Sequence, residues 1–405
     1  MVRKNYLEIS VLDAARERIN YVFDNFQKIY LSFSAGKDST AMFHLTMDEA
    51  KKRNRKIGIL FIDWECQFDL TISHAKKMFD LYKDNIDLYW IQLEITTNNA
   101  SSMYEPLWKS FDESKKELWV RGKEANTINH PIHLPFFYEN MTFEEFVPLF
   151  GKWYSGGEKC ACMVGIRTQE SLNRYRAIAR QNIKRLDDKT YTVNVIDDLW
   201  NIYPIYDWNV TDIWTYYSKF KKCYNEIYNL MHMAGLSINQ MRIDEPFGDE
   251  ARKNLWIYHI IEPNTWAKMI ARMEGVNTGS LYSKENGNVL GNIKISLPNG
   301  HTWESFSMHI LNTIPAKTGE HYKNKIAKYI KWYESRGYPD GIPDYVDPDL
   351  ERINKAPSWR LVAKCLLKND YWCRTLGFSI TKGNAYDKYM KLMKNKRDEW
   401  NLLNK

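Results

Sequence analysis

The first 93 residues alternate between segments of helical periodicity and short apolar runs. Hydrophobic side chains recur every three or four positions in three segments, residues 11–26, 42–53 and 68–82. This spacing predicts three amphipathic helices. Beside them lie three short apolar runs that are typical of buried strands, at residues 28–33, 57–62 and 88–93. Strands that alternate with helices of this length predict an α/β fold with a doubly wound, mainly parallel sheet.

The pattern changes twice further along the chain. It loosens at about residues 94–158, where we expect an irregular insertion, and then resumes up to about residue 220. Beyond that point the alternation fades, and helical stretches and loops dominate. A chain of 405 residues is also longer than one compact core usually holds. The sequence therefore predicts an α/β domain over residues 1–220 and a mostly helical domain over residues 221–405.

The net charge of the chain limits the ligands that it suits. With 57 Lys and Arg residues against 50 Asp and Glu residues, the chain carries +7 at neutral pH, which favours anions such as nucleotides, sulfate or nucleic acid. The most basic run, residues 51–56, is either a solvated helix end or a nucleic-acid contact. We favour the helix end, because no recognisable nucleic-acid-binding motif accompanies the run.

Two further features bear on where the protein works. The apolar runs are far shorter than the roughly 20 residues needed to cross a bilayer, so we expect no membrane partner. The start of the chain lacks the apolar core of a signal peptide, and six scattered cysteines do not form a disulfide framework. These features predict a cytoplasmic protein.

One polar loop lies between a predicted strand and a predicted helix. Residues 34–39 read Ser-Ala-Gly-Lys-Asp-Ser. At such a position backbone N–H groups and the positive helix end face an anion, and small residues let the backbone approach phosphate closely. Lys37 adds a positive charge and Ser39 a hydroxyl donor. The segment is not a Walker A loop, because Asp38 follows the lysine where that motif has Ser or Thr. A plain strand–helix turn is the alternative.

The loop resembles the Ser-Gly-Gly-Lys-Asp-Ser motif of the N-type ATP pyrophosphatase (PP-loop) superfamily, with Ala35 in place of the first glycine. Three later segments resemble motifs of one group within it, the phosphoadenosine phosphosulfate reductases and sulfate adenylyltransferase small subunits. They are residues 60–68, residues 165–174 (Gly-x-Arg-x-x-Glu-Ser-x-x-Arg) and residues 199–214 (close to Pro-Leu-x-x-Trp-x-x-x-Asp-Val-Trp). The resemblance implies a sheet of the adenine nucleotide α-hydrolase-like type.

The same resemblance implies a ligand and the residues that bind it. The implied ligands are ATP and Mg²⁺, with Asp38 as a ligand of the metal. Lys37 and Arg167 are the implied catalytic residues, because both can neutralise charge on phosphates. The implied nucleotide- and phosphate-binding residues are Ser32, Ser34, Ala35, Gly36, Lys37, Asp38, Ser39, Asp63, Gly165, Arg167, Glu170 and Arg174.

Some of these residues also have simpler interpretations. Asp63 follows a predicted strand and is equally well a helix cap or a turn carboxylate. Glu170 and Arg174 are one helical turn apart, so they can form a plain ion pair. The aromatic residues of the last motif, among them Trp208 and Trp214, we expect to pack in the core.

Two other groups of residues raise the question of a metal. Cys160 and Cys162 precede the Arg167 segment, and His130 and His133 can complete a site with them. We favour buried free thiols, because structural zinc normally needs four ligands at typical spacing. The acidic loop at residues 244–250 can hold Mg²⁺, but such loops are more often simply solvated.

Three functions fit the sequence. The first is an ATP pyrophosphatase-type enzyme that passes AMP to an anionic small-molecule or macromolecular acceptor, such as sulfate, a nucleic-acid base or a protein group. The second is a thiol-dependent phosphoadenosine phosphosulfate reductase. The intact Lys37-Asp38-Ser39 segment counts against it, and so does the lack of a Cys-Gly-Leu-His motif in the sequence.

The third function is a non-enzymatic regulator that senses adenine nucleotide and binds DNA or a protein. Residues 261–263 and 272–279 resemble a branch of the reductase-like family, to which the immunoglobulin-binding regulator A type belongs. A protein partner or a homodimer stays open for all three functions.

Overall fold

The computed structural model describes residues 7–101, 107–179, 183–248, 251, 254–273, 275–276, 295–314, 316–347, 350–351, 356–367, 370 and 373–378. The chain forms two compact units, Met1–Leu281 and Tyr282–Lys405. The expected boundary near residue 220 therefore falls inside the first unit. The reason is packing, since Tyr228, Trp266 and Met269 lie in the same buried cluster as residues of the sheet.

The secondary structure of the first unit follows the expected alternation of strands and helices. It begins with α1 (Val11–Asn25), β1 (Lys28–Phe33), α2 (Lys37–Lys52), β2 (Ile57–Ile62), α3 (Asp69–Leu81), η1 (Lys83–Asn85) and β3 (Ile86–Ile91). The segment between β3 and β6 contains β4 (Thr96–Asn98), β5 (Leu107–Lys109), η2 (Glu113–Leu118), η3 (Pro131–His133) and α4 (Phe143–Ser155). The remainder is β6 (Cys160–Val164), α5 (Leu172–Ala179), β7 (Thr192–Ile196), β8 (Leu199–Ile202), α6 (Val210–Phe220), α7 (Ile227–Met233), α8 (Trp256–Ile261) and α9 (Pro263–Arg272).

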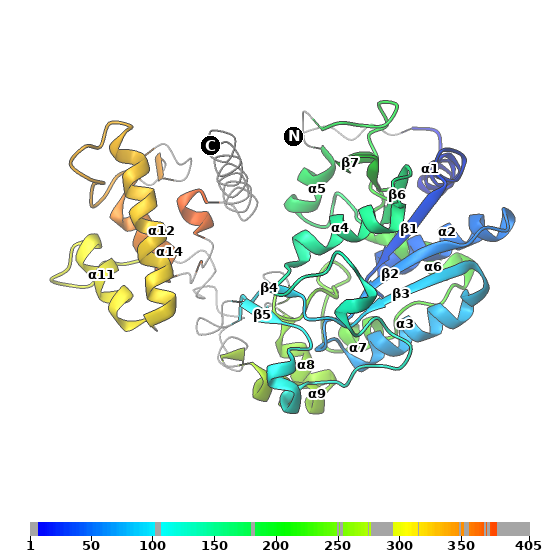
Figure 1. Cartoon of the computed structure of the whole chain (residues 1–405), viewed down its shortest axis with the longest axis horizontal. Coiled ribbons are helices and arrows are strands. Elements are labelled where there is room, and N and C mark those ends of the chain that lie inside the picture. Colours follow the sequence, from blue (N-terminus) through cyan, green and yellow to red (C-terminus); the bar gives the residue numbers. More distant parts are fainter. Residues whose placement is uncertain are drawn as a thin grey trace, which may run out of the picture. The chain divides into compact units, whose positions relative to one another are not determined.

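Six strands form one sheet in the order β3-β2-β1-β6-β8-β7 (Figure 1). Neighbouring strands from β3 to β8 run parallel, and β7 pairs antiparallel with β8. In this register Leu31 of β1 lies opposite Ile59 of β2 and Met163 of β6. The mainly parallel α/β sheet predicted from the sequence is confirmed.

Element boundaries differ from the predictions where the sequence signal is polar. β1 and β2 have the predicted bounds, but α2 begins at Lys37 instead of near Met42. Its first turn is Lys37, Asp38, Ser39 and Thr40, which carry no hydrophobic signal although all four are buried. Tertiary contacts bury this polar first turn. Hydrophobic periodicity does not detect polar residues, so the predicted start of α2 was too late.

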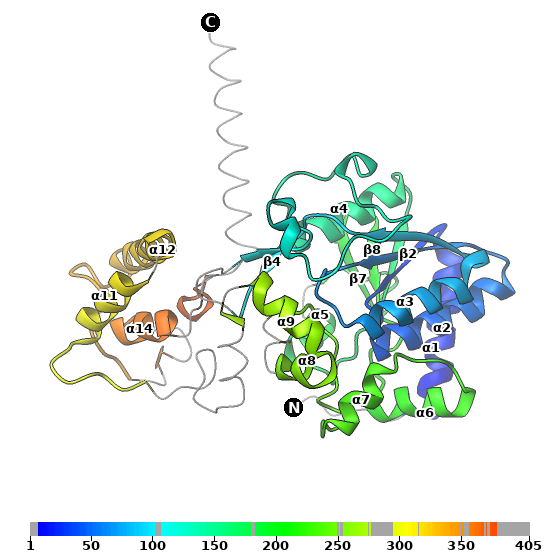
Figure 2. The same cartoon turned by 90° about the horizontal axis from the view of Figure 1, so that it is seen from below.

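Alternate strand residues pack on opposite faces of the sheet, as a two-residue period requires. On one face Leu31 and Ile59 join residues of α1, α2, α3 and α6 in a hydrophobic core. On the other face Tyr30 and Leu60 join residues of α4, α7, α8 and α9. Figure 2 shows α1, α2, α3 and α6 on one side of the strands and α4 on the other. The sheet is therefore covered on both faces.

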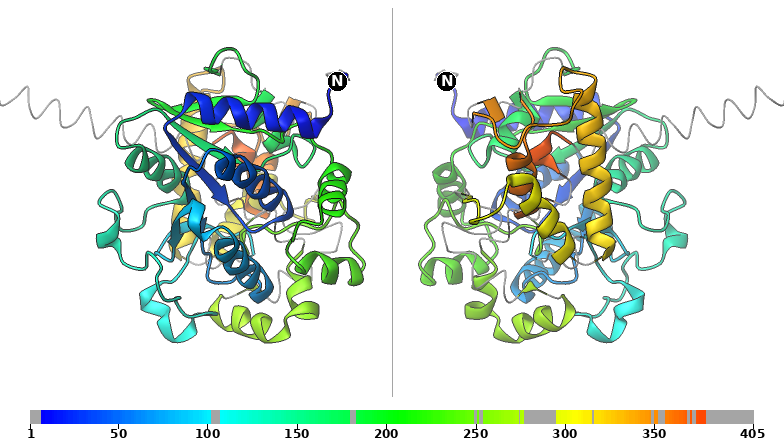
Figure 3. Two further views of the ribbon diagram at one scale, coloured as in Figure 1. Left: turned by 90° about the vertical axis from the view of Figure 1, so that its right-hand side faces the viewer. Right: turned by 90° about the vertical axis from the view of Figure 1, so that its left-hand side faces the viewer.

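The described part of the second unit is helical. It contains α11 (Trp303–Thr313), α12 (Ala316–Glu334), α14 (Trp359–Leu367) and the short turn η5 (Arg374–Leu376). These elements share one hydrophobic core, which includes Tyr322 and Tyr329 of α12 and Val362 of α14. Figure 3 shows α11, α12 and α14 side by side, coloured yellow to orange. The carboxylate of Asp344 accepts hydrogen bonds from the first two N–H groups of α11 and so caps it. Among the described residues of the chain, no helix is long and apolar enough to span a membrane.

Two buried histidines tie α2 to neighbouring segments. His44 contacts the Tyr82 hydroxyl at 2.6 Å through Nδ1 and the Cys223 carbonyl at 2.8 Å through Nε2. The carbonyl only accepts, so Nε2 carries a proton. His74 Nε2 lies 3.0 Å from the Thr40 hydroxyl. Burial lowers the pKa of each histidine to about 4.

We predict that these histidines make stability fall on acidification. Their folded-state pKa lies below the unfolded value, so the unfolded chain binds more protons between about pH 6.5 and pH 4, and stability decreases as pH falls through that window. The loss should be about 1–3 kcal/mol per histidine. Urea unfolding at a series of pH values should show a shallower decline for a His44→Gln/His74→Gln variant.

The exposed His133 offers a matched control, since His133→Gln removes an imidazole that is not buried. The prediction fails if the double variant and the control show the same decline as the parent chain.

Candidate functional site

Two of the sequence motifs meet where the strand order of the sheet reverses. From β1 the chain proceeds to β2 and β3 on one side, while β6 and β8 lie on the other side of β1. Ligands of open α/β sheets bind at such a point, outside the carboxyl ends of the strands. Residues 34–39 follow β1, and residues 165–174 follow β6. The topology therefore places both motifs at one edge of the sheet.

The loop after β1 turns tightly into α2. Ala35 adopts a left-handed backbone with φ of 58°, and Gly36 caps the helix without a side-chain hydrogen bond. The hydroxyl oxygens of Ser34 and Ser39 lie 3.0 Å apart, and the Ser39 hydroxyl donates to the Gly36 carbonyl at 3.2 Å. A left-handed alanine costs roughly 1 kcal/mol, which gives a physical reason for the glycine that stands at this position in the resembling motif.

Gly165 allows the loop after β6 to approach this turn. A Cβ atom at Gly165 would lie 2.7 Å from the Cα atom and 2.9 Å from the backbone nitrogen of Ser39. Both are backbone atoms at the start of α2, which cannot rotate away as a side chain can. The glycine is therefore needed for close approach of two backbones.

Three buried charges form the centre of the site. The Arg167 guanidinium donates to both carboxylate oxygens of Asp38, at 2.6 and 3.3 Å, and Lys37 Nζ lies 3.4 Å from the same carboxylate. All three side chains are less than a tenth exposed. Burial alone would raise the pKa of Asp38, but Lys37 and Arg167 hold it below its ordinary value. Asp38 therefore stays ionised and orients Arg167.

The described residues do not form a magnesium site of their own. Among them, no group of three His, Cys, Asp or Glu side chains is arranged to hold a metal ion. The oxygens of Asp38, the expected metal ligand, are shared with Arg167 and Lys37. Magnesium usually keeps several waters and binds through one or two carboxylates plus substrate phosphates, so the described residues alone do not fit this ion.

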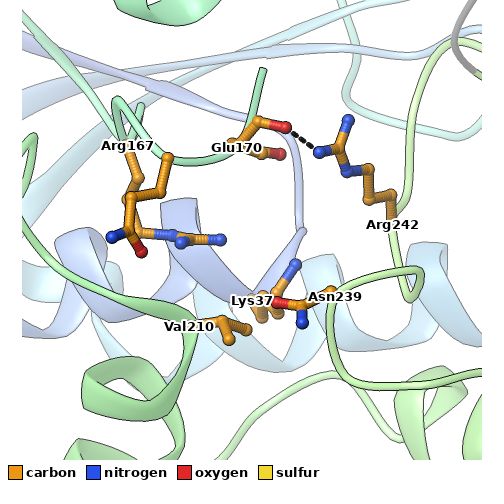
Figure 4. Close-up of a pocket in the computed structure, with 7 residues that line it drawn as sticks. Lys37, Arg167, Glu170, Val210, Asn239 and Arg242 are labelled. Atoms are coloured by element: carbon orange, nitrogen blue, oxygen red, sulfur yellow. Dashed lines mark hydrogen bonds between the residues drawn. The ribbon is translucent and has the colours of Figure 1, made fainter. Parts of the chain in front are cut away.

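A cavity of about 140 Å³ opens beside these charges. Figure 4 shows Lys37, Arg167 and Arg242 directed toward it from three different segments of the chain. The lining residues are Lys37, Arg167, Gln169, Glu170, Val210, Asn239 and Arg242. Three cations and one carboxylate around a space of this size suit a phosphate or sulfate group.

Glu170 and Arg174 form the ion pair that their spacing allows. Arg174 donates to the Glu170 carboxylate at 2.6 Å and also lies 3.6 Å from Asp244. The Glu170 carbonyl accepts a hydrogen bond from Arg242, drawn as a dashed line in Figure 4. Burial raises the pKa of Glu170 although Arg174 opposes the change. Glu170 lines the cavity, whereas Arg174 is not among the lining residues.

Residues that the sequence motifs did not reveal hold the loop in place. Tyr228 of α7 accepts a hydrogen bond from the Lys37 N–H at 2.9 Å, and Tyr217 of α6 donates to the Lys37 carbonyl at 2.5 Å. Lys37 Nζ donates to the Met241 carbonyl at 2.9 Å, and Asn225 donates to the Ala35 carbonyl at 3.2 Å. No sequence signal identifies these partners, because each is brought to the loop by tertiary folding.

Asp63 lies at the end of β2 but is not among the residues of the cavity. Both of its carboxylate oxygens accept from the Arg121 guanidinium, at 2.6 and 3.0 Å. Trp90, Gln92 and the Glu65 N–H donate to it as well. Ser32 is likewise absent from the cavity, since it lies within β1 and pairs with Leu60 and Val164. Of the twelve predicted binding residues, Lys37, Arg167 and Glu170 line this cavity.

The cysteines and histidines considered for a metal do not come together in the described residues. Cys160 and Cys162 are buried free thiols of β6 on the Tyr30 face of the sheet. Burial raises the pKa of both thiols, that of Cys162 to about 12. His130 and His133 are exposed. In the acidic loop, Asp244 pairs with Arg174 and Glu245 accepts from Trp108, while residues 249–250 lie outside the described residues.

Two sequence profiles of known families match the chain. A sequence profile of the phosphoadenosine phosphosulfate reductase domain matches residues 28–233, from the start of β1 to the end of α7. The chain belongs to the phosphoadenosine phosphosulfate reductase family. A second profile, of a domain of unknown function, matches residues 235–341 and 338–387.

Two uncharacterized proteins have sequences similar to this chain. The chain is 44% identical to the uncharacterized protein YbdN of Escherichia coli over 400 residues, which cover 98% of this chain and 97% of the relative. It is 26% identical to the uncharacterized protein MJ0066 of Methanocaldococcus jannaschii over 236 residues, 56% of this chain and 39% of that one. The similarity to YbdN thus extends over both units.

Solved structures of the superfamily resemble the chain distantly. A phosphoadenylyl-sulfate reductase from Candida auris is 16% identical, with a TM-score of 0.31 over 55% of this chain and 86% of that one. An FMN adenylyltransferase from Candida glabrata in complex with ATP is 14% identical, with a TM-score of 0.33 over 56% and 62%. The U34-tRNA thiolase NcsA from Methanococcus maripaludis is 13% identical, with a TM-score of 0.31 over 74% and 88%.

We predict that Gly165→Ala disrupts the site. The new methyl group would meet the Ser39 backbone at 2.7 Å, so either β6 or the start of α2 must shift. The expected cost is about 1–3 kcal/mol of stability, together with weaker nucleotide binding. Thermal unfolding and calorimetric titration with ATP measure the two effects.

Gly122→Ala is the matched control, because an added Cβ there meets no atom within 4 Å. It should change stability by less than about 0.5 kcal/mol. Equal behaviour of the two variants would contradict the close-approach role of Gly165.

Proposed function

We propose that the protein binds ATP at residues 34–39 and cleaves the bond between the α- and β-phosphates, passing AMP to an anionic acceptor. The observation that carries this proposal is the convergence of Lys37, Arg167 and Arg242 on one cavity at the start of α2. Membership of the phosphoadenosine phosphosulfate reductase family supports an adenine nucleotide as the ligand.

The proposed reaction needs positioning and charge neutralisation, with no nucleophilic side chain. An oxygen of the acceptor attacks the α-phosphorus, the bond to the bridging oxygen of the β-phosphate breaks, and its electron pair leaves with pyrophosphate. Lys37 and the positive end of α2 stabilise the leaving pyrophosphate. Arg167, held in orientation by Asp38, stabilises charge at the α-phosphate.

Three kinds of acceptor fit this proposal. One is a small oxyanion such as sulfate, the second is a nucleic-acid base, and the third is a protein group. Arg242, Gln169 and Asn239 line the cavity beyond the loop and can contact the acceptor. Because ATP is the proposed substrate, we place the activity in the cytoplasm.

A thiol-dependent reductase fits the described residues less well. The thiols of Cys66, Cys160 and Cys162 are buried, and burial raises the pKa of each, which opposes the thiolate that attacks a sulfonate. Among the described residues, no cysteine lines the cavity. The structure thus supplies the cations for phosphate chemistry but no activated thiol beside them.

A nucleotide-sensing regulator is the second candidate, and one contact favours it. The Lys37 N–H and ammonium groups already have partners in Tyr228 and Met241, so a phosphate must compete with protein groups for them. Binding that exchanges these contacts would shift α7 and the following loop, which suits a sensor as well as an enzyme.

We predict that the products of turnover are pyrophosphate and AMP or an adenylylated acceptor. Arg167→Ala should reduce kcat by at least about tenfold with a smaller change in ATP affinity, because charge at the α-phosphate develops in the transition state. Chromatography of the products formed from α-labelled ATP with a panel of acceptors measures this. ADP as the main product would refute the assignment, and no turnover with any acceptor would favour the sensor.

We also predict that Lys37→Ala weakens ATP binding by about 1–3 kcal/mol, the scale of a lost charge-assisted contact. Lys52→Ala removes the same charge from the other end of α2, where the side chain is 69% exposed, and should leave the affinity unchanged. Calorimetric titration compares the two variants. Equal ATP affinity of Lys37→Ala and the parent chain would contradict ATP binding at residues 34–39, under either candidate function.

A further inference from the structure

The net positive charge of the chain comes from its second unit. Residues 1–281 contain 36 Lys and Arg residues against 37 Asp and Glu residues, a net charge of −1. Residues 282–405 contain 21 against 13, a net charge of +8. The unit without the nucleotide site therefore carries the whole excess, which suits a separate anionic partner.

Helix α12 presents part of this charge beside an exposed aromatic ring. One face of the helix packs into the core through Tyr322, Ile326, Tyr329 and Tyr333. The exposed side of the helix carries Lys328, Lys331 and Trp332, and the exposed Arg336 follows in the turn after the helix. The Trp332 side chain is 51% exposed, although an indole ring usually packs in a core.

The cations of this face, Lys328, Lys331 and Arg336, are not neutralised by the described residues around them. None of the three forms an ion pair with a described carboxylate. Arg336 instead lies over the Trp332 ring, with its guanidinium carbon 3.9 Å from the ring centroid, and it donates to the Trp332 carbonyl. The indole is thus held in place by the arginine, which reduces the entropy that a stacking partner must overcome.

The basic run of the first unit, residues 51–56, behaves differently. Lys51 lies over the Tyr82 ring, and Lys52 and Arg53 pair with Glu49. Arg55 donates to backbone carbonyls at the end of α1, including that of Phe23. These contacts agree with the helix-end interpretation of the run and leave α12 as the better candidate for an anionic partner.

We propose that the exposed face of α12 binds single-stranded nucleic acid. Lysine and arginine neutralise phosphates, and an exposed indole stacks on an unpaired base. From Lys328 to its last residue, Glu334, the helix rises roughly 9 Å, nearly the rise of three nucleotides at 3.4 Å each. A duplex hides its bases, so the half-exposed Trp332 favours a single strand. This binding is independent of the function proposed for the first unit and requires no ATP.

The test uses the full chain and a fluorescently labelled 20-nucleotide single strand of DNA or RNA. Fluorescence anisotropy between 50 and 200 mM salt should show binding that weakens as salt increases. Lys328→Ala/Lys331→Ala should weaken binding and reduce the slope of log affinity against log salt by about 1 to 2. Trp332→Ala should weaken binding roughly 5- to 100-fold, and Trp332→Phe should retain most of the affinity.

Lys51→Ala/Lys52→Ala is the matched control, since it removes two lysines from the first unit and should not change binding. Circular dichroism checks that each variant is folded, and substitution of these exposed side chains should leave it so. Loss of ATP turnover or ATP binding in other variants does not bear on this result.

Three outcomes would overturn the proposal. The first is no binding at 50 mM salt. The second is equal binding of duplex and single strand without any effect of Trp332→Ala, which would leave only general attraction of a polyanion. The third is binding to phosphatidylserine vesicles but not to oligonucleotides, which would make lipid headgroups the partner.

Discussion

A buried cluster of three charges holds the candidate site together. Asp38 is ionised in a place where water cannot solvate it, and an unpaired buried carboxylate costs several kcal/mol. It therefore requires Lys37 beside it in the loop and Arg167 from the segment after β6. Because Arg167 reaches Asp38 only if the two backbones approach closely, Gly165 is part of the same constraint. The charge cluster thus links β1, α2 and β6 at the point where the sheet binds ligands.

Buried ion pairs also stabilise the structure at the end of β2, away from the cavity. Asp63 pairs with Arg121 of the insertion, and Glu65 pairs with Arg272 of α9 at 2.9 Å. Glu65 and Arg272 are both essentially unexposed, so loss of either leaves an uncompensated buried charge. These pairs fasten the insertion and α9 to the sheet. They explain why the first unit extends well past the last strand, and why a carboxylate at the end of β2 does not face the cavity.

The two units divide the chemistry of the chain between them. The first is nearly neutral and directs three of its cations, Lys37, Arg167 and Arg242, toward one cavity, where the low dielectric strengthens their effect on a phosphate. The second is strongly basic and has cations on the surface of α12. Their attraction for a polyanion grows with the number of phosphates contacted and weakens as salt increases. A net charge of +7 for the whole chain conceals this division.

The sequence by itself determined the α/β sheet, the family and most of the loop. Apolar runs and helical spacing reflect local burial, so β1, β2 and α1 were predictable, and Lys37, Asp38 and Arg167 were identified by motifs. Only the tertiary structure decided that Asp63 pairs with Arg121 and that the first unit ends at residue 281. It alone revealed Tyr228, which contacts the loop, and Arg242, which lines the cavity, each from a distant segment. Such contacts depend on long-range packing, which leaves no periodic signal in the chain.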